Sequence, residues 1–523
     1  MRLHLTLRFS VVALALLWSS FAYALVPPAG FDMTGFIQRA TRAQVGATPA
    51  VGPLRGGTLT INGIEMIVPN NSVVQMPAAS LTWAQLFDPA VSASVGYDPP
   101  RPNHANGRTG LSLQDPLVTH FPAYEVRVVG NILSDPVTGA QTYVVGLVVP
   151  VTQQGLNGGS GLINYIDYDG SVLGNPGRFC VGGLAGDPTT GTIIEINDPV
   201  GRFGVAHSPD PRFTADTNNP TISTASGYPV GIPVSDPALQ DDPLRPATQR
   251  PLNGALGFPV DPFLPAGAPL RSFTMPAPAP GVTPDSRLQV PLMVGDWVDF
   301  SGTLMKLNPL GNNSPANMFV SVHTLTANLG IQTAPGTNPA YIRVEEMLFG
   351  SGPSNPPAAP AQETSNRVQM VAFTTDPTAT ASIFAIDVDP TTGVETEVPF
   401  PNGANIPMND PVRGRIRLQT SKNLPDPPGN AILSPSTGTL TFTREYIVKL
   451  VGASRQVADV ANGLTAGQYR LPIFEYIFPE GAVFGEPIPP YNFNDFNFLA
   501  IGSGRLNGTT GPAIGRLDPW PGP

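Results

Sequence analysis

Short runs of alternating apolar and polar residues, each followed by a turn, are the commonest pattern in the chain. In these turns Asp or Ser accepts hydrogen bonds from the backbone ahead, Pro sets the first central φ, and Gly takes the left-handed position. Strand-type residues border each turn, so we predict four β-hairpins. Their turns are residues 135–139, 187–191, 389–393 and 434–438.

Helical spacing of apolar residues occurs in only two stretches. Residues 33–45 have this spacing, with Thr34 in the N-cap position. Residues 81–86 predict a single helical turn in which Trp83 is buried. We therefore expect helices to be few and short, and neither stretch carries a catalytic pattern.

Two halves of the chain repeat the same order of segments: a strand, an apolar run ending in Pro, an insertion, a strand containing Gly-x-aliphatic, and a further strand. We predict two related barrel-like modules, over residues 50–155 and 156–350. A chance similarity among Gly- and Val-rich strands is the alternative. The paired segments are 59–69 with 179–199, and 125–149 with 297–325.

A short motif in the second module resembles a known small barrel. Residues 294–304 read Val-Gly-Asp-Trp-Val-Asp-Phe-Ser-Gly-Thr-Leu. They resemble the Gly-Asp-x-Val-x-x-x-Gly strand of OB-type β-barrels, which recur in secreted bacterial proteins. The motif spans about a dozen residues, and the first module lacks the Gly-Asp pair. The resemblance implies a face that binds oligonucleotides or oligosaccharides.

The rest of the chain divides by composition. Residues 208–290 hold 17 prolines, and we interpret them as a Pro-rich insertion in the second module: an ordered cover over the barrel mouth or a mobile linker. Residues 351–366 read as an interdomain linker. Short strands then recur over residues 367–523, which predicts an immunoglobulin-like β-sandwich with an aromatic C-terminal tail packed back on a domain.

The N-terminus predicts export. Residues 1–24 have basic residues, a short apolar run and a small-x-small cleavage site, as signal peptides do. A membrane anchor is the alternative, but the run is shorter than the roughly 20 residues a span needs. We expect a secreted protein, extracellular or periplasmic, without membrane insertion after cleavage. Residues 25–49 form an N-terminal segment containing the first predicted helix.

Composition narrows the class of partner. The 523 residues include 55 Gly and 62 Pro, and only 13% are charged, which favours a loop-rich, mainly β protein over coiled coils. Loss of Arg2 and Arg8 changes the net charge from −10 to −12. That balance disfavours nucleic acid and anionic membrane surfaces as partners. Cys180 is the only cysteine, so the chain forms no internal disulfide.

Candidate chemistry is sparse. His207 and Ser208 are adjacent, but a Ser–His nucleophile needs separated residues and a third orienting group, and no Gly-x-Ser-x-Gly elbow occurs. Paired carboxylates would suit a glycosidase, yet nothing in the sequence brings two of them together. The acids on or near predicted strands are Asp167, Asp169, Glu195, Glu345 and Glu346.

Calcium is the one metal we keep as a hypothesis, because it takes oxygen ligands from acidic loops. Asp167 and Asp169 begin an Asp-x-Asp-Gly stretch, but the twelfth position is Arg178, so the EF-hand pattern fails. We predict no other cofactor.

Four aromatic side chains are candidates for stacking on sugar rings, with burial in cores as the alternative: Tyr165, Tyr168, Trp297 and Tyr491. We therefore expect an exported, non-catalytic binding or structural protein whose partner is carbohydrate or a cell-surface component. The alternative is a secreted glycosidase-like hydrolase with residues 208–290 as a lid. A structural protein that assembles through sheet edges is a third class.

Overall fold

The structure is a computed structural model that describes most of the chain from Ala29 onward. The residues it describes are 29–43, 56–87, 109, 111–113, 124–151, 158–233, 250–275, 290–308, 311–312, 314–335, 339–350, 367–400, 402–421, 442–452, 464–472, 475–477, 491, 493–506 and 511–522. The predicted signal peptide, the predicted linker and the turn at 434–438 lie outside these residues. Within the described ranges, no helix combines the length and apolarity needed to cross a bilayer.

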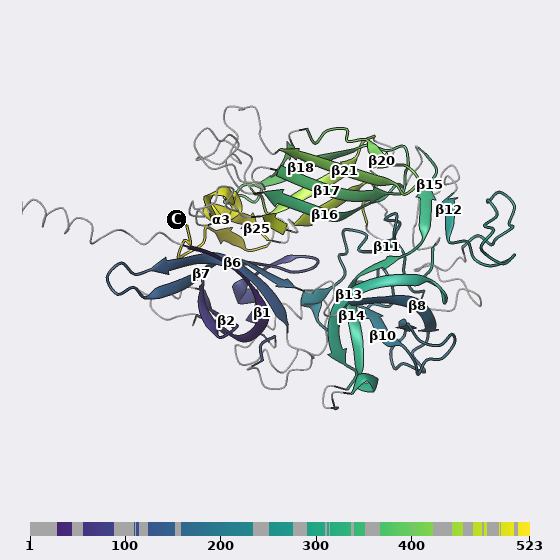
Figure 1. The fold of residues 1–523 in the computed structure, drawn as a ribbon, viewed down its shortest axis with the longest axis horizontal. Helices are drawn as coiled ribbons and strands as arrows, with labels where there is room; N and C mark the ends of the chain where they lie inside the picture. The colour runs from purple at the N-terminus through teal and green to yellow at the C-terminus, as the bar shows by residue number, and fades with distance from the viewer. Residues whose placement is uncertain are drawn as a thin grey trace, which may run out of the picture.

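Five strands near the N-terminus form the first barrel, purple to blue in Figure 1. They pair in the order β3-β2-β1-β6-β7, and a parallel β3–β7 pairing closes the barrel. Inward-facing side chains such as Leu59, Met66 and Val128 are almost wholly buried. The strands are β1 (Ala29–Arg42), β2 (Gly57–Ile61), β3 (Ile64–Val68), β6 (Glu125–Ser134) and β7 (Gln141–Val151), and the sheet is extended by β4 (Val73–Gln75) and β5 (Ser80–Thr82).

The second barrel, teal in Figure 1, repeats this topology. Its strands pair in the order β10-β9-β8-β13-β14, and a parallel β10–β14 pairing closes it. Numbered one to five along the chain, the strands of both barrels follow the circuit 1-2-3-5-4-1, the Greek-key order of an OB-type barrel. The strands are β8 (Gly158–Asp167), β9 (Arg178–Val181), β10 (Thr192–Ile196), β13 (Trp297–Lys306) and β14 (Met318–Ala327), with β11 (Ile222–Thr224) added beside β14.

The segments that the sequence pairs are equivalent strands. Strand β2 corresponds to β9, β3 to β10, β6 to β13 and β7 to β14. The recurring Gly-x-aliphatic motif also has one physical cause, because Gly130 and Gly302 both sit at register shifts in the fourth strand. A Cβ there would lie 2.1 Å from the carbonyl oxygen of Val144 and 2.2 Å from that of Ser321.

The helix predicted over residues 33–45 is wrong, because residues 29–42 form strand β1. Strand β1 has a register shift between Ile37 and Arg39, so Ile37 faces Ile61 and Ala40 faces Leu59. The bulge thus places residues three apart on the same inner face and mimics helical spacing. Residues Trp83–Phe87 form a 3₁₀ turn, η1, in which Trp83 is buried, as predicted.

Three of the four predicted hairpin turns lie in the described chain, and all three are confirmed. Asp135 Oδ1 accepts hydrogen bonds from the amides of Val137 and Thr138, at 2.8 and 2.7 Å, and Gly139 has a φ of 71°. The turns at 187–191 and 389–393 have the same Asp acceptor and left-handed Gly.

The C-terminal part is a sandwich of two sheets whose strands are mostly antiparallel, green in Figure 1. Side chains from both sheets, such as Met370 and Val448, share one core. The strand order is compatible with an immunoglobulin-like domain, and that finer assignment stays a prediction. One sheet is β20 (Met408–Asp410), β21 (Arg415–Ser421), β17 (Arg367–Thr374), β16 (Ile342–Gly350), β24 (Glu475–Ile477); the other is β19 (Glu395–Pro399), β18 (Ala381–Val388), β22 (Glu445–Leu450), β23 (Gln468–Pro472).

The C-terminal tail packs back across the molecule, as the sequence predicts. Phe493 and Phe496 are fully buried in the sandwich core. The side-chain Nδ2 of Asn131 on β6 donates to the carbonyls of Tyr491 and Pro521, at 2.8 and 2.7 Å. The tail therefore joins the first barrel to the sandwich. Its short elements are η7 (Phe493–Asp495), α3 (Asn497–Ala500), β25 (Gly502–Arg505) and β26 (Ala513–Gly515).

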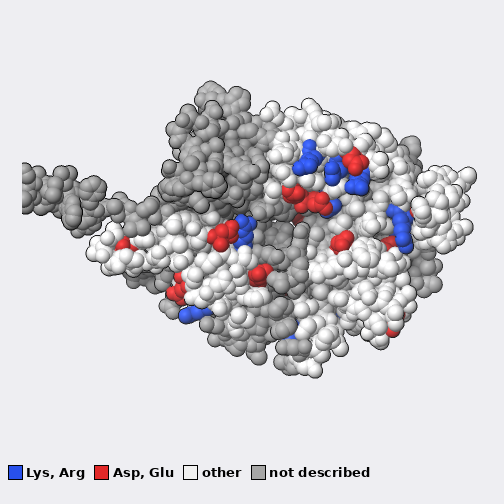
Figure 2. Space-filling model, viewed as in Figure 1, with Lys and Arg blue, Asp and Glu red and all other residues white. Residues whose placement is uncertain are grey.

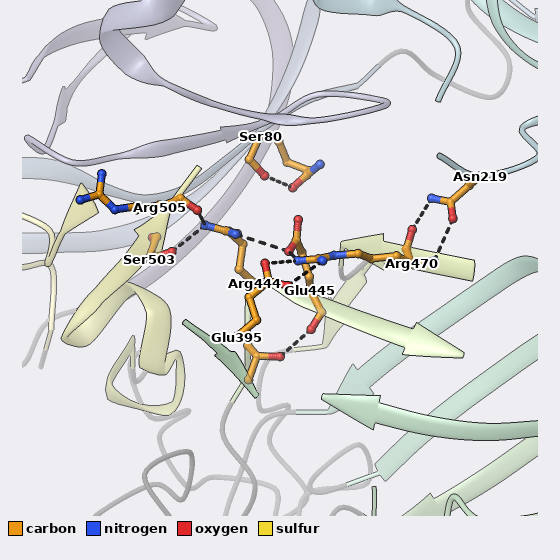
Figure 3. A network of polar contacts seen from close by, with 10 residues as sticks. Ser80, Asn219, Glu395, Arg444, Glu445, Arg470, Ser503 and Arg505 are labelled. Carbon is orange, nitrogen blue, oxygen red and sulfur yellow. Dashed lines mark hydrogen bonds and ion pairs between the residues drawn. The ribbon is translucent and has the colours of Figure 1, made fainter. Parts of the chain in front are cut away.

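Residues 198–221 are a hub that contacts all three modules. Within the hub, η3 (Pro211–Phe213) brings Phe213 into the first-barrel core, stacked 4.5 Å from Tyr124. Asn219 exchanges hydrogen bonds with the backbone of Arg470 on β23 (Figure 3). The described parts of the insertion at 208–290 are thus packed structure, including β12 (Ser272–Met275), which pairs with β15 (Gly330–Thr333).

A network of charged side chains surrounds the point where the hub meets the sandwich. Figure 3 shows Arg470 between Glu395 and Glu445, and Arg444 reaching the backbone carbonyls of Ser503 and Arg505. Burial alone would raise the pKa of Glu445, but the neighbouring Arg444 and Arg470 charges hold it below its ordinary value. The network links β19, β22, β23 and the tail.

Buried Asp216 in the hub gives a pH-dependent prediction. Burial raises its pKa to about 6, against the opposing hydrogen bonds from Asn218 and Asn219 and the charge of Arg202. Between about pH 4 and 6 the folded chain then holds a proton that the unfolded chain releases. We expect the free energy of unfolding to fall by about 3 kcal/mol as pH rises through this window. Above about pH 6, Asp216 is ionised in both the folded and the unfolded chain, so it should add no further pH dependence.

The measurement is urea unfolding of wild type and Asp216→Asn at intervals from pH 4 to 7. The variant should lose this fall. Asp135→Asn is the control, because Asp135 is exposed in its turn and its pKa is lowered rather than raised. An unchanged pH profile in Asp216→Asn would contradict the prediction.

Candidate functional site

The most distinctive exposed surface of the second barrel lies on the outer face of β8 and β13. Trp297 and Leu162 are cross-strand partners there, with 44% and 47% of their surfaces exposed. Their neighbours Val298 and Ile163 point inward and are fully buried. Because successive side chains of a strand point to opposite faces of the sheet, the Trp297 side chain points away from the barrel core.

Polar side chains border the indole on this face. The outward positions of β8 next to Trp297 are Leu162 and Ser160, because Gly159 and Gly161 alternate with them and face the core. Asp299 and Ser160 are also cross-strand partners and are both exposed. The face thus combines the Trp297 indole, the apolar Leu162 side chain and two polar side chains, and we call these four residues the Trp297 platform.

A second cluster lies on β9 and β10, the strands whose face OB-type barrels use for binding. Glu195 accepts hydrogen bonds from Arg178 Nε at 2.7 Å and Asn175 Nδ2 at 3.1 Å, and its other oxygen lies 2.6 Å from His207 Nδ1. The side chains of Glu195 and Arg178 are 4% and 10% exposed, and that of His207 is 44% exposed. The chain's own loops therefore cover this face.

The electrostatics of Glu195 favour its charged form. Burial alone would raise its pKa, but the His207 hydrogen bond and the His207 and Arg178 charges outweigh that effect and lower it. Both oxygens of the Glu195 carboxylate are thus occupied by side chains of the barrel and its loops. His207 and Ser208 point apart, since the Ser208 hydroxyl donates to Asn197 Oδ1 at 2.6 Å, so they do not form a nucleophile–base pair with each other.

The predicted calcium residues lie in the loop after β8. Asp167 is buried, and its oxygens accept backbone hydrogen bonds from Gly170, Val172 and Leu173, while Asp169 accepts one from Ser171. The described residues contain no group of three or more His, Cys, Asp or Glu side chains suited to a metal. Calcium binding at this loop stays a prediction.

The other predicted binding aromatics are not brought together with Trp297. Tyr168 is partly buried against the second-barrel core. Tyr491 is partly buried over Gly30 of β1, at the far side of the chain's fold. Tyr165 is a partly exposed residue of β8, paired with Cys180. Burial raises the pKa of the Tyr165 hydroxyl, and the Asp167 and Asp169 charges add to the effect.

The remaining candidate groups are dispersed. His323 is buried in β14, and burial lowers its pKa to about 4. Glu345 lies 3.5 Å from Arg343, and Glu346 accepts from Gln369 at 2.7 Å. Both acids are residues of β16, and each contacts a neighbouring side chain of the sandwich.

A shallow pocket opens where the sandwich meets the tail. Its empty volume is about 260 Å³ with open solvent included, and its lining contains Asp387 and Arg444. Burial raises the pKa of Asp387, and the Asp389 charge adds to this. Among the described lining residues Asp387 is the only carboxylate, so these residues do not supply the pair that a glycosidase-like hydrolase needs. The hydrolase hypothesis stays a prediction.

No protein family, curated protein or solved structure matches this chain. The topology defines its fold as two OB-type barrels followed by a β-sandwich, and the candidate sites rest on geometry alone.

Proposed function

We propose that this chain is an exported, non-catalytic binding protein and that its second barrel binds carbohydrate on the Trp297 platform. The observation that supports this proposal most directly is the exposed cross-strand pair of Trp297 and Leu162, with the exposed pair of Asp299 and Ser160 beside it. A contiguous exposed apolar pair bordered by polar side chains is the kind of surface that interaction sites use.

Carbohydrate fits the chemistry of this face. One side of a pyranose ring is lined with C–H groups, which pack on the flat indole of Trp297, while its hydroxyl groups need polar partners. Asp299 and Ser160 supply an acceptor carboxylate and a hydroxyl beside the indole. Binding of this kind requires no acid–base pair, in keeping with the lack of one at the platform.

The test is Trp297→Ala, assayed by affinity electrophoresis in a panel of soluble polysaccharides and by a glycan array. We expect the variant to lose at least about tenfold in affinity, because truncating an aromatic anchor at the centre of a binding surface costs about 2 kcal/mol or more. Val412→Ala is the control, because Val412 is 86% exposed and belongs to the sandwich rather than to the platform. Equal retention of wild type and Trp297→Ala, or no glycan binding by wild type, would refute the proposal.

A further inference from the structure

An apolar loop, residues 251–270, lies in the chain between the hub and β12 and projects from the second barrel. Three large side chains at its tip are largely exposed to solvent: Leu256 at 101%, Phe263 at 93% and Val260 at 70%. Figure 1 shows this loop, residues 251–270, extending beyond β12 at the edge of the molecule, and Figure 2 shows that edge almost wholly without charged residues. Its only charged side chain is Asp261.

The loop is ordered by a polar centre as well as by packing of its other apolar side chains on the second-barrel core. The Asn253 side chain donates to the carbonyls of Asp261 and Leu264, at 2.9 and 2.8 Å, and accepts from the Asp261 amide at 2.9 Å. The neck is closed by the Leu270 amide donating to the Pro251 carbonyl at 2.8 Å. The loop therefore presents exposed apolar side chains in a defined conformation, and an exposed apolar patch of this kind marks an interaction site.

The neck is anchored to the barrel by charge. Arg250 lies 2.6 Å from Asp296, and both side chains are about 97% buried. Arg271 at the other side of the neck is exposed and lies within hydrogen-bond distance of the Gly295 carbonyl. An exposed guanidinium thus stands at the base of a loop whose one charged side chain is Asp261.

Proline and internal pairing reduce the number of backbone donors in the loop. Five of its twenty residues are proline, at positions 251, 259, 262, 265 and 269, and these have no N–H group. The amides of Phe263, Leu264 and Gly267 donate within the loop. The amides of Leu256 and Val260 at the tip have no acceptor in the described loop, so they need water or polar groups of a ligand.

We propose that this loop docks on a phospholipid membrane, with Leu256, Val260 and Phe263 inserted at the boundary between headgroups and acyl chains. A convex apolar tip fits a soft apolar phase, and at the headgroup boundary water and polar headgroups can still pair with the tip amides that have no acceptor in the described loop. Arg271 then meets headgroup phosphates. The contact is interfacial and needs no membrane-spanning segment.

The test is co-sedimentation of residues 25–523, the predicted mature chain, with phosphatidylcholine vesicles, using wild type and the double variant Leu256→Ser/Phe263→Ser. We expect at least a tenfold loss of vesicle affinity in the double variant. Val137→Ser/Val412→Ser is the matched control, because these valines are 80% and 86% exposed on other loops. Thermal unfolding of each variant checks that all remain folded.

Three results would overturn this proposal. The first is failure of wild type to bind either phosphatidylcholine or mixed phosphatidylcholine–phosphatidylglycerol vesicles. The second is equal binding by wild type and the loop variant. The third is a lipid-free dimer, seen by analytical ultracentrifugation, that the loop variant abolishes, which would make a second copy the occupant. Trp297→Ala should bind vesicles as wild type does, which separates this proposal from carbohydrate binding.

Discussion

Alanine at Gly302 is expected to lower the free energy of unfolding by about 3 kcal/mol or more, at the upper end of the cost of overpacking. The new Cβ would lie 2.2 Å from the Ser321 carbonyl oxygen and 2.7 Å from the carbon of that carbonyl. These atoms are backbone in a paired strand of a closed barrel, so they cannot rotate away as a flexible side chain can. Relief requires opening the β13–β14 pairing at its bulge.

The measurement is urea unfolding at neutral pH, with circular dichroism as the probe. Gly204→Ala is the matched control: Gly204 is also buried, but the nearest atom to its added Cβ would be the Ile232 carbonyl oxygen at 3.9 Å. We expect that control to change stability by less than about 1 kcal/mol. A similar midpoint for wild type and Gly302→Ala would show that the barrel tolerates the bulge without glycine.

Much of the barrel architecture follows from local sequence chemistry, because turns and glycine-bounded strands are local signals. The paired segments 59–69 and 179–199 predict equivalent strands, and both barrels bear this out. The error at residues 33–45 has a local cause too. A bulge at Gln38 makes Ile37 and Ala40 share one face, and only the partner strand β2 reveals that bulge.

The candidate sites depend more on pairing between distant segments. Trp297 is predictable as an outward-facing strand residue, but its partner Leu162 is set by the β8–β13 register, 135 positions apart in sequence. Glu195 and His207 are each recognisable as chemistry-bearing residues. Their contact requires the chain to return after β10 through the Asp198–His207 bridge, which no periodicity signals.

The insertion at 208–290 shows the same limit. Its prolines predict loops but do not distinguish a mobile linker from an ordered cover. The deciding contacts come from single polar side chains, Asn253 within the apolar loop and Arg212 within the hub, and each forms several long-range or cross-loop hydrogen bonds. Such residues look ordinary in a Pro-rich sequence because their partners are backbone carbonyls.

Arg212 should accordingly be the most sensitive residue of the hub. Its side chain is 3% exposed and makes two hydrogen bonds to Asp210, at 2.9 and 2.8 Å. Its NH1 group donates to the carbonyls of Leu86 and Thr109, at 3.2 and 2.7 Å, in the part of the chain that packs with the first barrel. We expect Arg212→Met to cost about 3–5 kcal/mol, because it leaves the Asp210 carboxylate buried without its countercharge.

The measurement is urea unfolding together with calorimetry. Arg413→Met is the control, because its guanidinium is 72% exposed, 3.8 Å from Asp410, and a surface pair of this kind contributes at most about 1 kcal/mol. The double variant Asp210→Asn/Arg212→Met should recover part of the loss, because it removes the stranded charge as well. A loss in Arg212→Met no greater than in Arg413→Met would mean that the hub contacts do not couple the barrels. A single calorimetric transition in wild type that broadens or splits in Arg212→Met would show that this one guanidinium makes the two barrels unfold together.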